Sequence, residues 1–101
     1  LRIKELLNVR KDRAKAKITL DILKKRTDLL ARLLGKDENG TVVPDDQKIT
    51  PNQFRDLSQK IDEDQRKQMN ELNQEYEKHD RELRTKYPNN WYYANYQFDR
   101  F

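Results

Sequence analysis

The stretch "ITPNQF", which starts at Ile49, marks the beginning of a helix more clearly than any other part of the chain. Thr50 is a favoured N-cap residue, Pro51 suits the first helical position, and Gln53 at the third can complete a capping box. Ile49 before the cap and Phe54 after it have the spacing of a hydrophobic staple. The stretch therefore predicts a helix that begins at Pro51.

Downstream of this start, apolar residues recur at close to the 3.6-residue helical period. Pro88 disfavours helical geometry in the residue before it, so the helix is expected to span 51–87 and to end at Lys86 or Tyr87. Polar residues interrupt its apolar face. The apolar positions are Leu57, Ile61, Leu72, Tyr76 and Leu83, and the interruptions are Gln65, Gln68 and His79.

Upstream, residues 1–35 predict an equally long helix, because Gly35 is the only Gly or Pro among them and suits a helix C-cap. Two helices of similar length, each with a narrow apolar face, predict an all-α antiparallel helical hairpin with coiled-coil-like packing. The alternative is a bent or open pair. The first apolar row of the upstream helix is Ile3, Leu7, Ala14, Ile18, Ile22, Leu29 and Leu33, and a second row that widens it is Leu6, Leu20, Leu23, Leu30 and Leu34.

The acidic connecting loop, residues 36–50, partly resembles an EF-hand calcium loop. With Gly40 at the sixth position of that pattern, Asp37 falls at the third, Asn39 at the fifth and Asp46 at the twelfth. However, the first position is Gly35 instead of Asp, and the twelfth lacks the bidentate Glu. The other interpretation is two turns, at the Asn-Gly and Pro-Asp steps. We favour the turns, and expect no metal site and no tight calcium binding.

The composition restricts the class of protein. The charged fraction is 40%, well above the roughly 25% of ordinary globular chains. With no Cys, the chain has no disulfides, thiolate metal sites or Cys nucleophiles. No apolar run is long enough to span a membrane. The first residue is Leu1, and no secretory signal pattern follows it, so we expect a trimmed terminus and a location in the cytoplasm or in an intracellular or viral assembly.

Positive charge is concentrated in the upstream helix. Residues 1–36 hold 12 Lys and Arg against 4 acids, whereas residues 51–87 hold 8 against 9. This basic helix has three interpretations: it binds phosphates, it docks on an acidic protein, or it is a solvated face partly neutralised by Asp62, Glu63 and Asp64. The candidate binding residues are Arg10, Lys11, Arg13, Lys15, Lys17, Lys24, Lys25 and Arg26.

No pattern indicates catalysis. His79 is the only His, and we expect it to occupy a partly exposed position on the helix–helix seam between Tyr76 and Leu83. With only two Gly residues the chain has no Gly-rich phosphate loop. We therefore expect no enzyme activity, no cofactor and no small-molecule substrate.

The C-terminal segment, residues 88–101, is rich in aromatic residues. Together with Tyr87, its six aromatic residues make seven side chains, which represent on the order of 1,000 Å², more than a monomer usually exposes. They are expected to fold back on the open end of the hairpin, to dock into a protein, or to stack on bases. Tyr and Trp are typical interface anchors, which favours the protein. The predicted protein-binding residues are Tyr87, Trp91, Tyr92, Tyr93, Tyr96, Phe98 and Phe101.

Together these features favour a non-enzymatic structural or assembly subunit, which binds protein partners through the aromatic tail and the basic helix. The alternative is a nucleic-acid-binding accessory protein of a nucleoprotein particle, which uses the basic face of the first helix.

Overall fold

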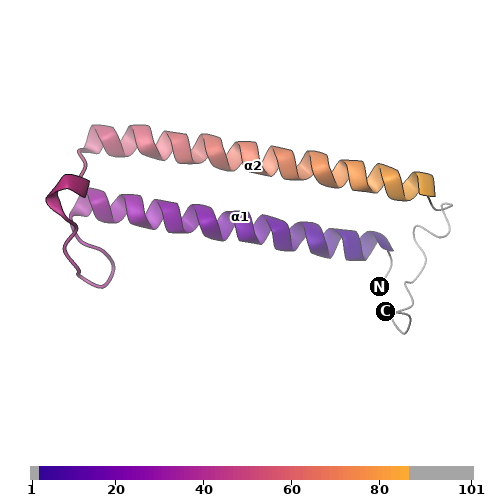
Figure 1. Cartoon of the computed structure of the whole chain (residues 1–101), viewed down its shortest axis with the longest axis horizontal. Helices are drawn as coiled ribbons and strands as arrows, with labels where there is room; N and C mark the ends of the chain where they lie inside the picture. Colours follow the sequence, from indigo (N-terminus) through magenta and orange to yellow (C-terminus); the bar gives the residue numbers. More distant parts are fainter. Residues whose placement is uncertain (1–2, 87–101) are drawn as a thin grey trace. The chain divides into compact units, whose positions relative to one another are not determined.

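The computed structural model describes residues 3–86 of the chain. Along these residues the elements are α1 (Ile3–Leu34), the 3₁₀ helix η1 (Asp45–Gln47) and α2 (Pro51–Lys86) (Figure 1). The two long helices pack against each other. The all-α class is confirmed for the described residues, and both helices have the predicted bounds to within a few residues. Tyr87 and the predicted tail, residues 88–101, lie outside the described residues.

The chain divides into two compact units. Residues 18–68 form the loop unit, which contains the second half of α1, the connecting segment and the first half of α2. Residues 1–17 and 69–101 form the terminal unit, in which the first half of α1 meets the second half of α2. Each unit has its own contacts between the helices.

The C-terminus of α1 and the N-terminus of α2, which flank the connecting segment, have the predicted caps. The Thr50 amide donates to Gln53 Oε1 at 2.9 Å, and the Gln53 amide donates to Thr50 Oγ1 at 3.2 Å. This reciprocal pair is the capping box expected from the sequence. Gly35 has a φ of +82°, and its amide donates to the Ala31 carbonyl at 2.8 Å. A left-handed residue at this place ends α1 as predicted.

The connecting segment contains the predicted Asn-Gly turn. One carboxylate oxygen of Asp37 accepts hydrogen bonds from the amides of Asn39 and Thr41, both at 2.9 Å, and Gly40 has a φ of +80°. The carboxylate at the third position of the calcium-loop pattern is thus engaged by the chain's own backbone. After the turn the chain makes an isolated antiparallel bridge between Lys36 and Val42.

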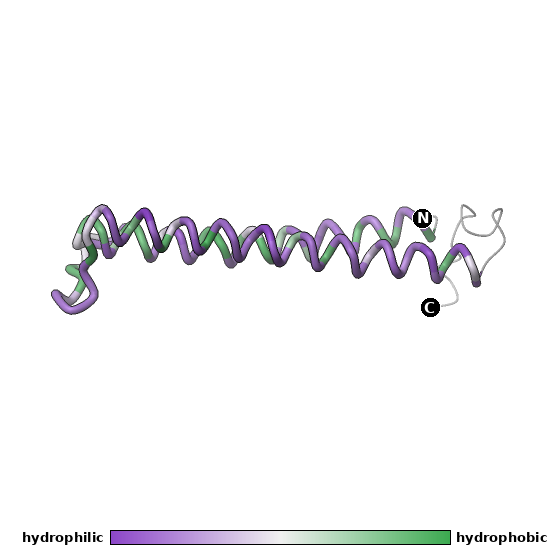
Figure 2. The backbone as a smooth tube through the Cα atoms, turned by 90° about the horizontal axis from the view of Figure 1, so that it is seen from above, coloured by the Kyte–Doolittle hydropathy of each residue, from purple (hydrophilic) through white to green (hydrophobic). Residues whose placement is uncertain are grey.

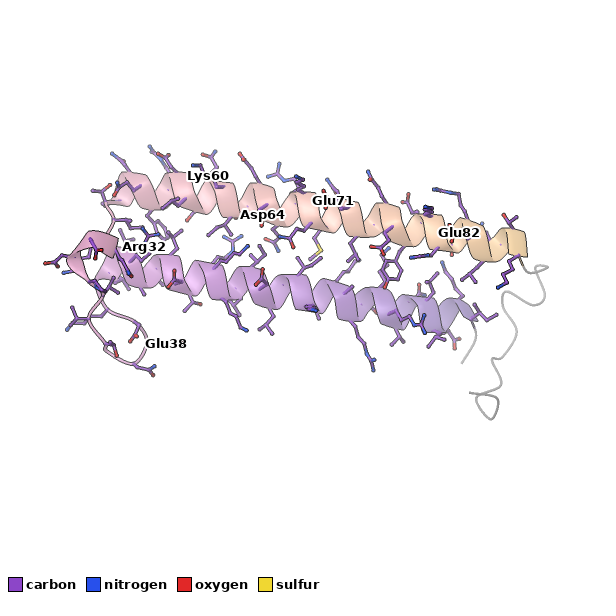
Figure 3. The ribbon with its side chains drawn as sticks, viewed as in Figure 1. Arg32, Glu38, Lys60, Asp64, Glu71 and Glu82 are labelled. Carbon is purple, nitrogen blue, oxygen red and sulfur yellow. The ribbon has the colours of Figure 1, made fainter. Side chains whose placement is uncertain are left out.

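Hydrogen bonds of the Arg32 side chain and backbone connect this segment to the end of α1. Arg32 Nε donates to the Gln47 carbonyl at 2.8 Å, and the Ile49 amide donates to the Arg32 carbonyl at 3.2 Å (Arg32 is labelled in Figure 3). Gln47 is the last residue of η1, which follows Pro44 at the second predicted turn. The side chain and the backbone of one residue therefore hold both η1 and the entry to α2.

The interior is narrow and follows the first predicted apolar row. In the loop unit Ile22 and Leu29 are buried, with 2% and 5% of their surface exposed, and in the terminal unit Leu72 is buried. The other members of this row, and the other predicted apolar positions of α2, are half-buried. Apolar residues accordingly recur along the helices in Figure 2. The first row is confirmed as the face that packs against α2.

The second predicted row does not widen this face, and that prediction is wrong for four of its five leucines. Leu20, Leu23, Leu30 and Leu34 are 45–69% exposed, whereas Leu6 is half-buried. The reason is their position around the helix. At roughly 100° per residue, Leu23 and Leu20 lie about 100° and 160° from the buried Ile22, too far around α1 to reach α2.

The seam position predicted for His79 belongs instead to its neighbour. The His79 side chain is 46% exposed, whereas that of Asp80 is 18% exposed. Asp80 tolerates this position because Lys4 Nζ lies 2.6 Å from its Oδ1 and Arg84 Nε lies 3.2 Å from its Oδ2. A half-buried carboxylate is stable when cations supply its hydrogen bonds.

Candidate functional sites

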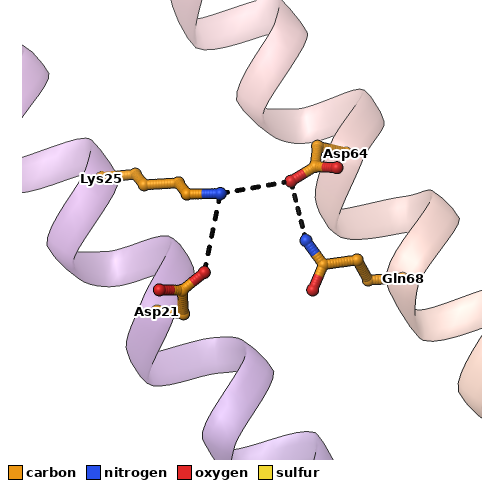
Figure 4. Close-up of polar contacts among 4 residues, drawn as sticks. All are labelled: Asp21, Lys25, Asp64 and Gln68. Atoms are coloured by element: carbon orange, nitrogen blue, oxygen red, sulfur yellow. Dashed lines mark hydrogen bonds and ion pairs between the residues drawn. The ribbon is translucent and has the colours of Figure 1, made fainter.

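The eight candidate basic residues occupy different positions on α1, and two of them in the loop unit contact α2. Lys25 Nζ lies 3.6 Å from Asp21 and 3.5 Å from Asp64 Oδ2 (Figure 4). Gln68 Nε2 donates to the same Asp64 oxygen at 2.7 Å. The Lys25 ammonium is thus placed between a carboxylate of its own helix and one of α2.

Arg26 makes the second of these contacts between the helices. Its guanidinium forms an ion pair with Asp62 and donates to Gln65 Oε1 at 3.2 Å. The prediction that acids of the second helix partly neutralise the first is therefore confirmed for Asp62 and Asp64, while Glu63 is exposed. Because Lys25 and Arg26 are used within the unit, they have less capacity to bind an external anion.

In the terminal unit, Lys11 and Lys15 are half-buried on the side of α1 that faces α2. Lys11 lines a shallow groove of about 220 Å³. The groove mixes cations and carboxylates, so it does not select a ligand of one charge. Its lining residues are Lys4, Leu7, Asn8, Lys11, Tyr76, Glu77, Asp80 and Arg81.

Besides Lys25, which contacts α2, four candidate cations are exposed. In the terminal unit, Arg10, Arg13 and Lys17 follow one another at spacings of three and four residues, which places them on one face of α1. Lys24 is exposed in the loop unit. These residues form the part of the predicted basic face that an external partner can reach.

Four of the six large apolar residues that are exposed among the described residues lie in one row on α1 in the loop unit. It consists of Leu20, Leu23, Thr27, Leu30 and Leu34, all exposed, and we call it the leucine row. Its spacing is 3, 4, 3 and 4 residues, the spacing of a coiled-coil seam. Sequence reasoning missed this surface because it assigned these leucines to the face that α2 covers, although the spacing itself was visible.

His79 lies among charged and aromatic neighbours of its own helix. Its Nε2 is 3.6 Å from Glu75 Oε1 and its Nδ1 is 3.7 Å from Glu82 Oε2. The Tyr76 ring meets the imidazole edge-on at a centroid distance of 5.6 Å. Both ring nitrogens face carboxylates, so this arrangement does not activate a nucleophile.

Within residues 3–86, no group of three or more His, Asp or Glu side chains is arranged to hold a metal ion. Neither of the long helices described here has an apolar stretch that is long enough to cross a membrane. The predicted aromatic binding residues, from Tyr87 to Phe101, lie outside the described residues.

Comparison with known proteins assigns no relative to the chain. No protein-family model, no curated protein and no solved structure matches it. The surfaces described above are therefore the basis for a functional proposal.

Proposed function

We propose that this chain is a non-enzymatic assembly subunit that binds a protein partner. The observation that carries the proposal is the distribution of large apolar residues in the loop unit. Ile22 and Leu29 are buried there, whereas four leucines of the same helix are exposed. Removal of apolar surface from water is favourable by roughly 25 cal/mol per Å², so an ordered row of exposed leucines favours association.

The outer side of α2 differs from α1 in this respect. Among the described residues, none of the large apolar residues that are exposed belongs to α2. Exposed charges cover that helix instead, for example Lys60, Glu71 and Glu82 (labelled in Figure 3). A polar and charged helix face favours solubility, whereas one apolar row on one helix is typical of a binding surface.

The proposal includes the antiparallel, coiled-coil-like hairpin predicted from the sequence. In the loop unit, the order of the contacts supports it. Lys25 meets Asp64, and further along α1 the Arg32 carbonyl meets the amide of Ile49. Later residues of α1 thus meet earlier residues of the partner segment, as an antiparallel pair requires.

We also propose that the aromatic tail anchors the subunit to its partner. The support is its composition, since Tyr and Trp are enriched at binding hot spots. Deletion of residues 89–101 is expected to leave the helices intact by circular dichroism but to abolish recovery in the assembly. Trp91→Ala is expected to weaken binding by at least about 2 kcal/mol. A truncated chain that still assembles but melts earlier would show that the tail stabilises the hairpin instead.

The experiment that tests the proposed function is the native mass of the particle that contains this chain. We expect a mass well above that of the 12.3 kDa chain, unchanged by nuclease. A native mass equal to one chain would refute the assembly function. A particle that collapses on nuclease treatment would favour the second candidate function.

That second candidate is nucleic-acid binding by the terminal unit. The observation that favours it is the exposed face formed by Arg10, Arg13 and Lys17. Each phosphate contact contributes about 0.9 to the slope of log affinity against log salt. Replacing all three residues with Gln is expected to reduce this slope by about 2–3. The matched control is Lys25→Gln with Arg26→Gln, which removes cations already paired with α2; equal losses in both variants would exclude this site.

A further inference from the structure

We infer that the leucine row is a self-association surface, at which α1 of one chain pairs with α1 of a second copy. The inference rests on the proposed function, because it names the protein that the apolar surface binds. It concerns the loop unit only, where all five residues of the row lie.

The geometry of the row suits a helix as its partner. Residues spaced alternately by three and four form one straight seam, into which the side chains of a facing helix interdigitate. The row is self-complementary, since two identical seams related by a two-fold axis present the same leucines to each other. The face that carries Ile22 and Leu29 is already covered, and it points away from the row. Pairing through the row therefore leaves the α1–α2 contacts in place.

The one polar member of the row can be buried without an unsatisfied group. The Thr27 hydroxyl donates a hydrogen bond to the Leu23 carbonyl at 2.9 Å. A buried hydroxyl with a partner avoids the desolvation cost of an unpaired one. The middle of the row is thus compatible with a dry interface between helices.

Charge favours a second copy over a charged partner. The loop unit, residues 18–68, holds 10 Lys and Arg against 10 Asp and Glu, so its net charge is zero. The positive excess lies elsewhere, with 7 Lys and Arg against 2 acids in residues 1–17. Beside the row, Lys24 is exposed, whereas Arg26 pairs with Asp62. Two loop units therefore do not repel each other, and the rim of the row has little charge with which to attract an acidic helix.

The size of the row sets the expected affinity. Its four leucines are only 45–69% exposed in the single chain, so the rest of their surface is already covered. Two such rows bury less than the roughly 1,200 Å² at the lower end of standard interfaces, which is the range of weak and transient complexes. We therefore expect a reversible dimer with a dissociation constant in the micromolar range, on the order of 10 μM.

The test is sedimentation equilibrium of the full 101-residue chain, from about 1 μM to about 1 mM. The wild type is expected to change from monomer to dimer across this range. Leu23→Glu, which places a carboxylate in the middle of the seam, is expected to weaken the dimer at least about 100-fold. The matched control is Val42→Glu, because Val42 is an equally exposed apolar residue, 63% exposed, but lies outside the row. It is expected to change the dissociation constant by less than about 3-fold.

Three results would overturn the inference: a wild type that stays monomeric throughout, a Leu23→Glu variant that dimerises like the wild type, or a chain ending at Lys86 that no longer dimerises. Circular dichroism checks that each variant keeps its helices. If Leu23→Glu loses them, Leu23→Ala retains helix propensity and is expected to weaken the dimer about 10-fold. A monomeric wild type together with a large native particle would refute self-association but not the assembly function.

Discussion

The two faces of α1 in the loop unit carry the same kinds of residue in opposite surroundings. Leu29 is 5% exposed and its neighbour Leu30 is 45% exposed, although one step along the helix separates them. The difference lies in the direction of α2, which covers the Leu29 side only. Which leucines of this helix are buried is thus decided by their position around it. The regular seam spacing of the uncovered face is the basis of the proposed partner surface.

The largest expected effect is a difference in unfolding free energy between a substitution on the covered face of α1 and one on its uncovered face. Ile22→Ala leaves a cavity on the covered face and should lower the free energy of unfolding by about 2–4 kcal/mol. Leu23→Ala removes a side chain from the uncovered face and should change it by less than about 0.5 kcal/mol. Urea unfolding followed by circular dichroism at low micromolar protein measures both. Equal losses would mean that α2 does not distinguish the two faces.

The next effect concerns the N-terminus of α2, the helix that covers the Leu29 side of α1. Thr50→Ala removes the hydroxyl that accepts from the Gln53 amide and should lower the free energy of unfolding by about 1 kcal/mol. Thr41→Ala is the matched control, since Thr41 contributes its backbone amide to the Asp37 turn. Self-association through the leucine row should be unchanged in both variants. A Thr50→Ala variant as stable as the control would contradict the importance of the capping box.

A smaller difference in folding stability is expected between two cations of α1, one that contacts α2 and one that is exposed. Arg26→Gln breaks the ion pair with Asp62 and is expected to lower the free energy of unfolding by about 0.5 kcal/mol at low salt, because both partners are partly exposed. Lys24→Gln removes an exposed cation and should have almost no effect. The difference between the variants should shrink at about 1 M salt, where screening acts over roughly 3 Å. A difference that persists at high salt would indicate lost packing of the Arg26 stem.

The smallest expected effect is that of the ion pair between Asp45 in η1 and Lys48, which belongs to neither face of α1. Lys48 hydrogen-bonds and attracts the Asp45 carboxylate, which holds the pKa of Asp45 below its ordinary value. Because the folded pKa is depressed, the pair stabilises the fold above the unfolded pKa of about 3.9, and this contribution is lost as the pH falls through the folded pKa. The Asp45 side chain is highly exposed, so the effect is weak. Carboxyl titration by NMR should show the pKa rising in Lys48→Gln; an unchanged midpoint would exclude the pair.

The features that the sequence predicted correctly are those set by neighbours along the chain. The Thr50–Gln53 box, the Gly35 cap and the Asn-Gly turn each depend on contacts within four residues. The features that it missed depend on distant residues. That Asp80 occupies the seam in place of His79 follows from Lys4, 76 residues away.

The leucine row and the division of the basic residues were missed for a related reason. Periodicity shows that residues share a face, but it does not show which of two faces meets the other helix. Lys25 and Arg26 were assigned to the same group as Arg10 and Arg13, because their contacts with α2 depend on the register between the helices. The sequence predicted acids of the second helix as partners of the basic helix, but it did not show which basic residues they contact.

The hydrogen bonds around Arg32 have a consequence for how the chain folds. Arg32 contacts Gln47 across 15 residues, and the contacts of Gly35 and Asp37 span still shorter distances. Closing a loop of this length costs little entropy, and the cost grows slowly with loop size. We therefore expect the turn between α1 and α2 to form early, before the helices pair outward from it, as in other helical chains with local contacts. Substitutions at Arg32 should then slow refolding, whereas substitutions at Leu72 should mainly speed unfolding.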